Sequence, residues 1–223
     1  MRTIKELLIP RPSKLLDGIP DGEAECLLRS LGATTVAYEK GEPIAKQWSK
    51  ATHHYLVASG EVHTYYSHES GRRSVTGVFR HGDSFGIIFA FSEMRLNPSS
   101  AVAVRDTVAV RIPIVEIITN GILVKSACGI KYIQNFVDLI AQSAFNARLR
   151  AFVLEQPTIE ERVLAYLKEK AKHAHSSTFD IPLDRQELSD FLACDRSSLS
   201  SVLAKMRGKR IIDFSKNHFE LKA

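Results

Sequence analysis

The stretch that decides the fold is LDRQELSDFLACDRSSLSSVLAKMRGKRIIDFSKNHFEL, residues 183–221. Asp184 is suited to cap a helix that runs RQELSDFLA, and Asp195 is suited to cap a second helix, RSSLSSVLAKMR. After Gly208 the sequence alternates apolar and polar residues around a turn at 215–217, which predicts a β hairpin. Two short helices followed by a hairpin form a winged helix-turn-helix.

A helix-turn-helix places its second helix in the major groove of DNA and anchors it on the first. The apolar residues expected to pack between the two helices are Leu188, Phe191, Leu192, Leu199, Val202, Leu203 and Met206. The side chains left for the groove are Arg196, Ser197, Ser200 and Ser201. Arg196 can donate two hydrogen bonds to a guanine edge or contact a phosphate. The alternative is that Arg196 is a solvated helix-start residue paired with Asp195 or Asp184.

The charge pattern supports a nucleic-acid partner. The chain of 223 residues has a formal net charge of +5 and a pI near 9.1, and its length suits two modest domains. Between 205 and 222 six basic residues stand against two acidic ones. The candidates for phosphate contact are Lys205, Lys209, Arg210 and Lys216.

The remaining composition limits the compartment and the chemistry. Cys26, Cys128 and Cys194 lie far apart without a CxxC pair, so neither a disulfide framework nor a metal site is expected. No apolar run reaches the length of a signal peptide or a membrane span. We therefore expect a reduced, cytoplasmic protein that has no membrane partner.

From 36 to 113 the sequence contains short segments rich in β-branched and aromatic residues, separated by turn residues. This pattern predicts an antiparallel β domain, with ESGRR at 69–73 as the tip of a hairpin. A different pattern begins at Ile130, because no Pro or Gly occurs from there to Gln156. We expect one long helix in this second stretch.

That helix carries an apolar heptad seam. Its members alternate steps of three and four residues and are Ile130, Ile133, Val137, Ile140, Ala144, Ala147, Ala151 and Leu154. The period favours a two-stranded coiled coil, although a monomer could bury the same stripe against its own core. The polar residues off the seam could face a sensor pocket; they are Gln134, Asn135, Asp138 and Gln142.

Pro157 should stop this helix, and a new amphipathic helix is expected at 159–171, followed by the polar linker KHAHSSTFD. The chain is thus divided into a sensor β domain, a dimerisation helix and a DNA-binding domain. Their expected bounds are 1–121, 122–156 and 157–223.

In order along the chain stand YLVASGEVHTYY at 55–66, GDSFG at 82–86, the heptad helix, and the helix pair with its following strand at 183–214. In this order they resemble the regulators grouped with the cAMP receptor protein and the fumarate-nitrate reduction regulator, the Crp/Fnr family. The resemblance implies an α+β chain with a jelly-roll-like double-stranded β-helix, similar to cyclic-nucleotide-binding domains, and a winged helix-turn-helix. It also implies a homodimer that binds a roughly palindromic operator in double-stranded DNA and regulates transcription, with RNA polymerase as a further candidate partner.

The sequence departs from the family where cyclic-nucleotide-binding members hold their ligand. Those members place a glutamate after the GDxFG turn and later an arginine and a small hydroxyl residue. Here Ile87 follows the turn, and Ser99, Ser100 and Ala101 occupy the later positions, with Arg95 the nearest replacement cation. Loss of both charged contacts predicts that cAMP is not the ligand.

The apolar run GIIFAFSEM favours a less charged small molecule, although a vestigial pocket or a plain core strand would look the same. The candidate pocket residues are Phe85, Gly86, Ile87, Ile88, Ser99, Ser100, Ala101, Gln134 and Asp138.

Four other classes of function fit the sequence less well. Three scattered cysteines do not supply an iron-sulfur cluster. Haem ligation is conceivable but is not favoured; its candidate ligands are His53, His54, His63, His68 and His81. No P-loop, nucleophile elbow or HExxH motif occurs, so we expect no enzyme, and the identity of any cofactor stays unknown. A ligand-binding regulatory subunit that acts on a protein partner is the alternative, but it would not need residues 183–214.

Overall fold

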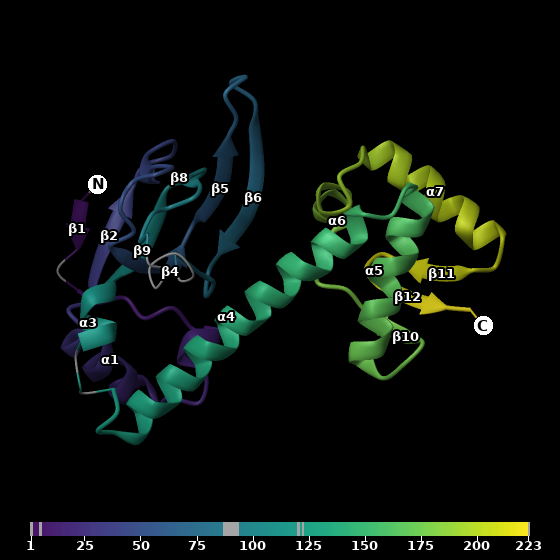
Figure 1. Ribbon diagram of the computed structural model, residues 1–223. Coiled ribbons are helices and arrows are strands. Elements are labelled where there is room, and N and C mark those ends of the chain that lie inside the picture. Colours follow the sequence, from purple (N-terminus) through teal and green to yellow (C-terminus); the bar gives the residue numbers. More distant parts are fainter. Residues whose placement is uncertain (1, 5, 87–93, 120, 122, 223) are drawn as a thin grey trace. The chain divides into compact units, whose positions relative to one another are not determined.

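The structure, a computed structural model, describes residues 2–4, 6–86, 94–119, 121 and 123–222. The chain forms two compact units, Met1–Ala141 and Gln142–Ala223. The boundary falls inside the long helix α4 (Ala127–Leu154), which confirms the long helix predicted from the sequence (Figure 1).

The first unit is built on two antiparallel sheets, as the sequence predicts. The five-stranded sheet has the order β1 (Arg2–Ile4), β2 (Thr34–Tyr38), β9 (Thr107–Pro113), β4 (His53–Ser59) and β7 (Ser84–Phe85). The four-stranded sheet has the order β3 (Pro43–Ala45), β8 (Ser100–Ala103), β5 (Glu61–Ser67) and β6 (Arg73–Arg80). The expected hairpin tip joins β5 to β6, where Gly71 has φ 79° and allows the tight reversal.

The five-stranded sheet buries both faces, because side chains alternate along each strand. On one face Leu56 and Ile112 pack with helices η1 (Lys14–Leu16), α1 (Asp21–Ser30) and the start of α4. On the other face Tyr55 and Val57 pack with residues of the four-stranded sheet, such as Val62. A short helix, α3 (Ile114–Thr119), follows β9. The inner face, between the two sheets, is therefore the interior of the sensor unit.

The first half of α4 is anchored to the sensor unit. Tyr132 and Phe136 lie in its core, and the side-chain amide of Asn135 donates to the carbonyl oxygens of Leu15 and Asp17 at 3.0 and 2.8 Å. The expectation that Asn135 faces a ligand pocket is therefore wrong, because its amide holds α4 against η1.

The second unit begins with the second half of α4, where Leu149 and Val153 enter a separate core. It continues with α5 (Ile159–Ala174), β10 (Thr178–Asp180), α6 (Arg185–Phe191), α7 (Arg196–Gly208), β11 (Ile212–Ser215) and β12 (His218–Leu221). Asp184 caps α6 through a reciprocal capping box with Glu187, and Asp195 is the N-cap residue of α7. The helix starts and the hairpin predicted from the sequence are confirmed.

One element of this unit was missed. The segment expected to be a polar linker contains β10, which pairs with β12 so that Phe179 lies opposite Phe219. Phe179 is buried between two exposed neighbours, Thr178 and Asp180. A single buried residue in a polar segment is too short a pattern to reveal a strand, and only the partner strand makes it one.

Candidate nucleic-acid interface and sensor interior

Helix α7 has one buried face and one exposed face. Leu199, Leu203 and Met206 are buried, and they share a core with Leu188 and Leu192 at α6 and its C-terminal end. The opposite face carries four exposed polar side chains, which are Arg196, Ser197, Ser200 and Ser201. The structure thus brings together on one surface the residues that the sequence assigns to the DNA groove.

Arg196 has no ion pair or side-chain hydrogen bond among the described residues, and so does not pair with Asp184 or Asp195. The hydroxyl of Ser200 donates to the carbonyl oxygen of Arg196 at 2.9 Å, within the helix. Burial, followed by the charges of Arg196 and Arg207, lowers the pKa of the Arg185 guanidinium. Arg185, Arg196 and Arg207 therefore form a group of cations near the start of α7 that repel one another. Binding of a polyanion would reduce this repulsion.

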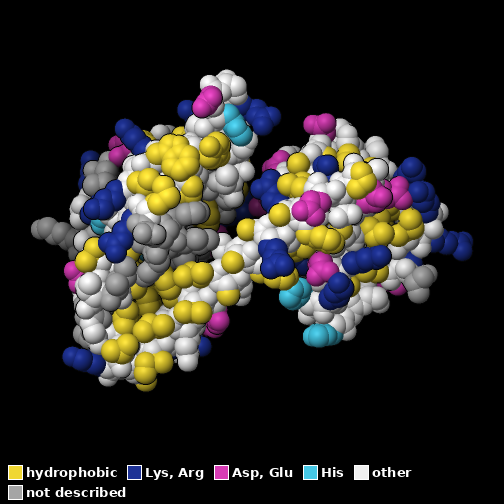
Figure 2. Space-filling view, viewed as in Figure 1, with side chains coloured by type: hydrophobic (Ala, Val, Ile, Leu, Met, Phe, Trp, Pro, Cys, Tyr) yellow, Lys and Arg dark blue, Asp and Glu magenta, His cyan; other side chains and the backbone are white. Residues whose placement is uncertain are grey.

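The four candidates for phosphate contact fall into two kinds. Lys205 and Lys209 both face Glu160 of α5, with N–O distances of 3.8 and 2.8 Å, so part of their charge is already balanced. Arg210 and Lys216 are exposed and have positive φ values of 57° and 52°. Figure 2 shows basic side chains along the edge of this unit where Figure 1 places α7.

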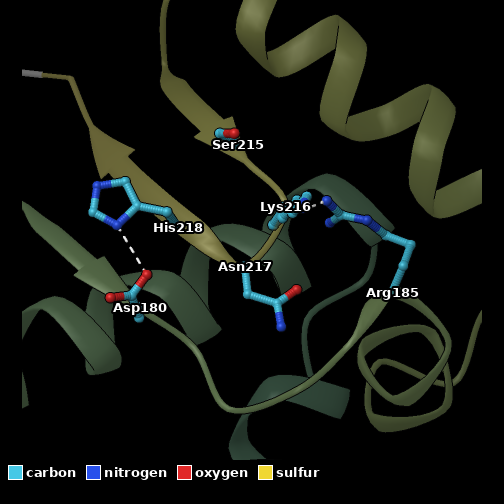
Figure 3. A pocket seen from close by; sticks show the side chains of 6 residues that line it. All are labelled: Asp180, Arg185, Ser215, Lys216, Asn217 and His218. Atoms are coloured by element: carbon cyan, nitrogen blue, oxygen red, sulfur yellow. Dashed lines mark hydrogen bonds and ion pairs between the residues drawn. The ribbon is translucent and has the colours of Figure 1, made fainter.

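The wing, which is the hairpin of β11 and β12, is fixed to α6 by Arg185 (Figure 3). Its guanidinium donates to the carbonyl oxygen of Lys216 at 3.1 Å and lies over the ring of Phe214. On the other side of the turn, Nδ1 of His218 lies 2.9 Å from a carboxylate oxygen of Asp180. Asp180, Arg185, Lys216 and His218 line a surface hollow of about 590 Å³. The position of Lys216 therefore depends on contacts with both α6 and β10.

The candidate pocket residues in the sensor interior are largely filled by aromatic packing. Phe85 stacks on Tyr55 with ring centroids 4.8 Å apart, and Phe79 lies 5.3 Å from Phe85. Ala101 is buried in the same cluster. Gly86 has φ 83°, and a Cβ there would meet the carbonyl oxygen of His53 at 3.0 Å, which explains the glycine.

The other candidate pocket residues are less enclosed. Ser99 is half-buried, and the hydroxyl of Ser100 accepts a hydrogen bond from the backbone N–H of Gln47 at 3.0 Å. Gln134 and Asp138 are exposed on α4, and Arg95 is exposed too. Two further candidates, Ile87 and Ile88, lie outside the described residues.

A cation on the inner face was missed by the sequence analysis. Arg111 of β9 lies directly opposite Tyr55 of β4 and Thr34 of β2. Its Nε is buried without a hydrogen-bond partner. Burial and the charge of Arg111 lower the pKa of His53 to about 4. Strand alternation alone did not place Arg111 beside the pocket, since 55 residues separate it from its neighbour in space.

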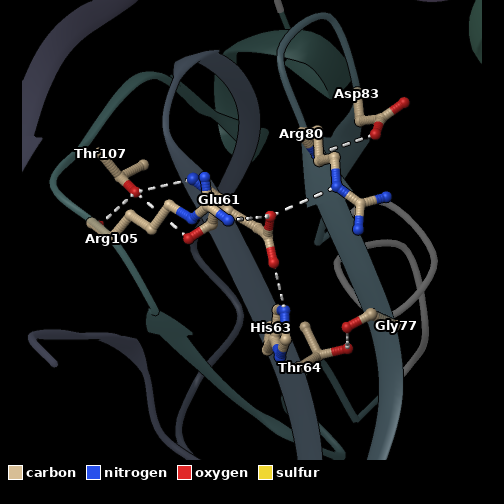
Figure 4. A network of polar contacts seen from close by, with 8 residues as sticks. All are labelled: Glu61, His63, Thr64, Gly77, Arg80, Asp83, Arg105 and Thr107. Atoms are coloured by element: carbon tan, nitrogen blue, oxygen red, sulfur yellow. Dashed lines mark hydrogen bonds and ion pairs between the residues drawn. The ribbon is translucent and has the colours of Figure 1, made fainter. Parts of the chain in front are cut away.

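Charges at the start of β5 are paired (Figure 4). Glu61 accepts from Nε2 of His63 at 2.7 Å and from Nε of Arg80 at 3.3 Å, and Arg105 approaches it to 4.0 Å. The hydrogen bond from His63, followed by the charge of Arg80, holds the pKa of Glu61 below its ordinary value. Glu61 therefore fixes the strand ends and is already satisfied.

Other candidate chemistry receives little support from the described residues. No group of three His, Cys, Asp or Glu side chains is placed there to hold a metal ion. Cys26 is exposed, whereas Cys128 and Cys194 are half-buried, and burial raises the pKa of the Cys194 thiol. Within the same described part of the chain, no helix has the length and apolarity to cross a membrane.

Two family models match the chain. Residues 35–118 match the cyclic nucleotide-binding domain, and residues 161–222 match the Crp-like helix-turn-helix domain. No curated protein matches it.

Solved structures share the fold at low identity. Catabolite activator protein from Thermus thermophilus is 22% identical, with 94% of each chain covered and a TM-score of 0.56. FixK2 from Bradyrhizobium japonicum is 22% identical, covering 86% of this chain and 93% of its own, with a TM-score of 0.54. The c-di-GMP responsive regulator CLP from Xanthomonas campestris is 18% identical, covering 90% and 99%, with a TM-score of 0.55.

Proposed function

Because the chain belongs to the Crp/Fnr family of DNA-binding transcription regulators, we propose that it acts as a homodimer on a roughly palindromic operator. Its control comes from a small-molecule or redox signal other than cAMP, and it catalyses no reaction. The single observation that carries the proposal is the exposed polar face of α7, led by an Arg196 that has no partner among the described residues.

The sequence-specific part of the proposal rests on the position of Arg196. It is the first residue of α7, and in a helix-turn-helix the first residues of the second helix meet the base edges. A free guanidinium there can form the bidentate contact with guanine, which is the commonest specific contact with a base and discriminates against the wrong base by about 1–3 kcal/mol. The hydroxyls of Ser197, Ser200 and Ser201 can bond to bases or to the DNA backbone and so specify bases less strictly. Contacts with phosphates and the shape of the DNA should therefore contribute more of the affinity.

The dimer is supported by side chains that α4 leaves exposed. Ile130 and Val137 are 47% and 55% exposed, and Ala144, Ala147 and Ala151 are exposed too. Ile133 and Ile140 instead pack partly against the sensor core, so they contribute less to a seam. An apolar stripe at a seven-residue spacing is what a second copy of the helix would cover.

The exclusion of cAMP is supported by Ser99, which stands where cyclic-nucleotide-binding members carry an arginine. The cyclic phosphate would lose its charge-assisted partner there. CLP is described as responsive to c-di-GMP, so regulators of this fold are not restricted to one effector. An alternative role as a regulatory subunit of a protein partner would leave the exposed polar face of α7 without a use.

The test is binding to a duplex selected from a random pool by the wild-type protein. Arg196→Ala should weaken binding to this duplex by about 1–3 kcal/mol and relax the base preference at one position in each half-site. Lys168→Ala is the matched control, because Lys168 is an exposed cation on α5 of the same unit.

Both variants should keep the wild-type circular dichroism spectrum. Unchanged affinity and unchanged base preference in Arg196→Ala would refute the assignment. Failure of the wild-type protein to enrich any sequence would refute sequence-specific binding altogether.

A further inference from the structure

An unpaired cation lies inside the sensor unit. Arg111 points to the inner face of the five-stranded sheet, because it pairs in register with Tyr55, whose ring belongs to the core between the sheets. Its side chain is partly buried, and Nε is fully buried. Among the residues that the structure describes, its guanidinium has neither a hydrogen bond nor an ion pair.

Several other arginines of the unit have acidic partners. Arg11 pairs with Asp21 at 3.0 Å and donates to two backbone carbonyl groups. Arg29 pairs with Glu25 at 2.7 Å, and Glu61 is shared by Arg80 and Arg105. A guanidinium removed from water needs a counter-charge or hydrogen-bond acceptors. The buried Nε of Arg111 therefore needs a partner that the described chain does not supply.

The groups around Arg111 are suited to an anion. Tyr38 and Tyr55 are 4% and 9% exposed, both are electrostatically coupled to Arg111, and neither hydroxyl has a hydrogen bond among the described residues. His53 stays neutral at pH 7 because burial and Arg111 lower its pKa to about 4. The carboxylate of Glu42, whose charge acts on Tyr38, accepts a hydrogen bond from the backbone N–H of Glu39 at 3.0 Å.

We propose that Arg111, together with the hydroxyls of Tyr38 and Tyr55, binds the oxyanion group of a small molecule inside the sensor unit. The group is a carboxylate or a phosphate, because both match the paired donors of a guanidinium. The stacked rings of Tyr55 and Phe85 supply an apolar wall beside it. This assignment rests on the proposed function, since it names the chemical class of the effector.

This site differs from the segment where the ligand motif of the family would lie. Ser99 belongs to the approach to β8, whereas Arg111 comes from β9 in the opposite sheet. The lack of a cation at Ser99 predicts that cAMP is not the ligand, and the apolar run GIIFAFSEM favours a less charged one. The structure supplies a cation from another strand, so the ligand carries a negative charge.

The test measures thermal unfolding of the full-length protein in sodium benzoate, sodium phosphate or sodium chloride at matched ionic strength. Wild-type protein should be stabilised in a saturable way by benzoate or by phosphate, and chloride should have no such effect. Arg111→Gln should raise the dissociation constant for the stabilising anion by roughly 10- to 100-fold. Arg105→Gln, which removes a 74% exposed arginine, should leave it unchanged.

Two further measurements distinguish loss of the anion site from misfolding of the variant. Without added anion, Arg111→Gln should unfold at the wild-type temperature or above it, because it removes a partly buried charge that lacks a partner. Tyr38→Phe removes only a hydroxyl and should weaken anion binding several-fold. Stabilisation by benzoate alone would assign a carboxylate, and by phosphate alone a phosphate.

Absence of saturable stabilisation in wild-type protein, or an equal loss in Arg111→Gln and Arg105→Gln, would overturn the proposal. Binding of each variant to the selected duplex without anion is measured in parallel. Normal duplex binding beside absent anion binding overturns only this site. Normal anion binding beside absent duplex binding overturns only the proposed function.

Discussion

Two arginines without an ion pair among the described residues, Arg196 and Arg111, differ in how far they are exposed to solvent. Arg196 is exposed at the start of α7, and water satisfies its guanidinium until DNA arrives. Arg111 is partly buried between sheets, and its Nε has no partner. An exposed free charge costs little stability, whereas a desolvated one costs much more. Ligand binding should therefore stabilise the sensor unit strongly, and DNA binding should depend mainly on the surface of the second unit, Gln142–Ala223 (the head).

Helix α4 repeats this contrast along its length. Tyr132 and Phe136 are buried in the sensor core, and Leu149 and Val153 are buried in the head core. Between and beside them, apolar residues such as Val137 stay exposed. The buried residues hold the helix to its own chain, and the exposed ones are available to a second copy.

The largest effect is expected from charges placed on that exposed stripe. Val137→Asp combined with Ala144→Asp puts four carboxylates into the proposed dimer seam. Each uncompensated buried charge costs about 3–5 kcal/mol, so the dimer should dissociate at micromolar concentration. Sedimentation velocity would measure this.

Gln142→Asp combined with Asn146→Asp is the matched control, because it adds the same charge to exposed positions of α4 outside the heptad seam. A seam variant that sediments as the wild-type dimer does would contradict the proposed seam. Dissociation of both double variants would show that net charge on the helix, and not the stripe, decides assembly.

The second effect is a loss of stability that is confined to the head. Leu203 is 1% exposed in the head core, and Leu203→Ala should cost about 2–5 kcal/mol. Calorimetry should show a lower transition temperature for the head, with the sensor transition unchanged. Val202→Ala, at a half-buried neighbouring position, should cost less. An equal shift of both transitions would mean that the two units unfold as one.

Much of the head follows from local sequence. Asp184 and Glu187 stand three residues apart and form the capping box that starts α6. Burial of Leu199 and Leu203 on α7 follows from helical spacing. By contrast, Phe179 forms part of a strand only because β12 lies beside it, and no local pattern reveals this.

The sensor site was much harder to predict for the same reason. The position of Arg111 beside Tyr55 is set by strand register across 55 intervening residues. The ligand motif of the family corresponds to Ser99 instead. The ion pairs of Lys205 and Lys209 with Glu160 likewise join separate helices and were not foreseen.

The third effect is a pH dependence of the sensor unit. His54 is completely buried, and burial lowers its pKa to about 3 in the folded state. The unfolded histidine titrates near 6.5, so the unfolded chain binds the extra proton as the pH falls below that value. Folded stability from this group is therefore present above pH 6.5 and is lost on acidification. Between pH 7 and pH 5 the loss should be about 2 kcal/mol.

Denaturant titrations at these two pH values would measure it. His54→Phe should remove about 2 kcal/mol of the pH dependence, although His53, whose pKa is also lowered, leaves a remainder of the same sign. His175→Asn is the control, because His175 is exposed and asparagine tolerates its positive φ of 50°. An unchanged pH dependence in His54→Phe would show that His54 does not stay neutral in the fold.

The smallest effect concerns the wing, and it completes the comparison of exposed and buried cations. Lys216 is exposed at the hairpin turn, and its backbone carbonyl is held by Arg185. If its ammonium group meets a phosphate, Lys216→Ala should lower the salt dependence of duplex binding by about one ion. The affinity should fall by less than about 1 kcal/mol, equally for the selected duplex and a scrambled one.

Lys172→Ala removes an exposed lysine that pairs with Glu169 on α5 and should leave the slope unchanged. A drop in the Lys216→Ala slope confined to the selected duplex would instead make the wing a reader of bases. An unchanged slope would place the wing outside the phosphate path, leaving Arg210, an exposed cation between α7 and β11 without an ion pair among the described residues, as a candidate for that contact. An exposed cation has no desolvation penalty in the free protein that DNA binding could relieve. Its contribution should therefore be easier to detect in the salt dependence of duplex binding than in the affinity.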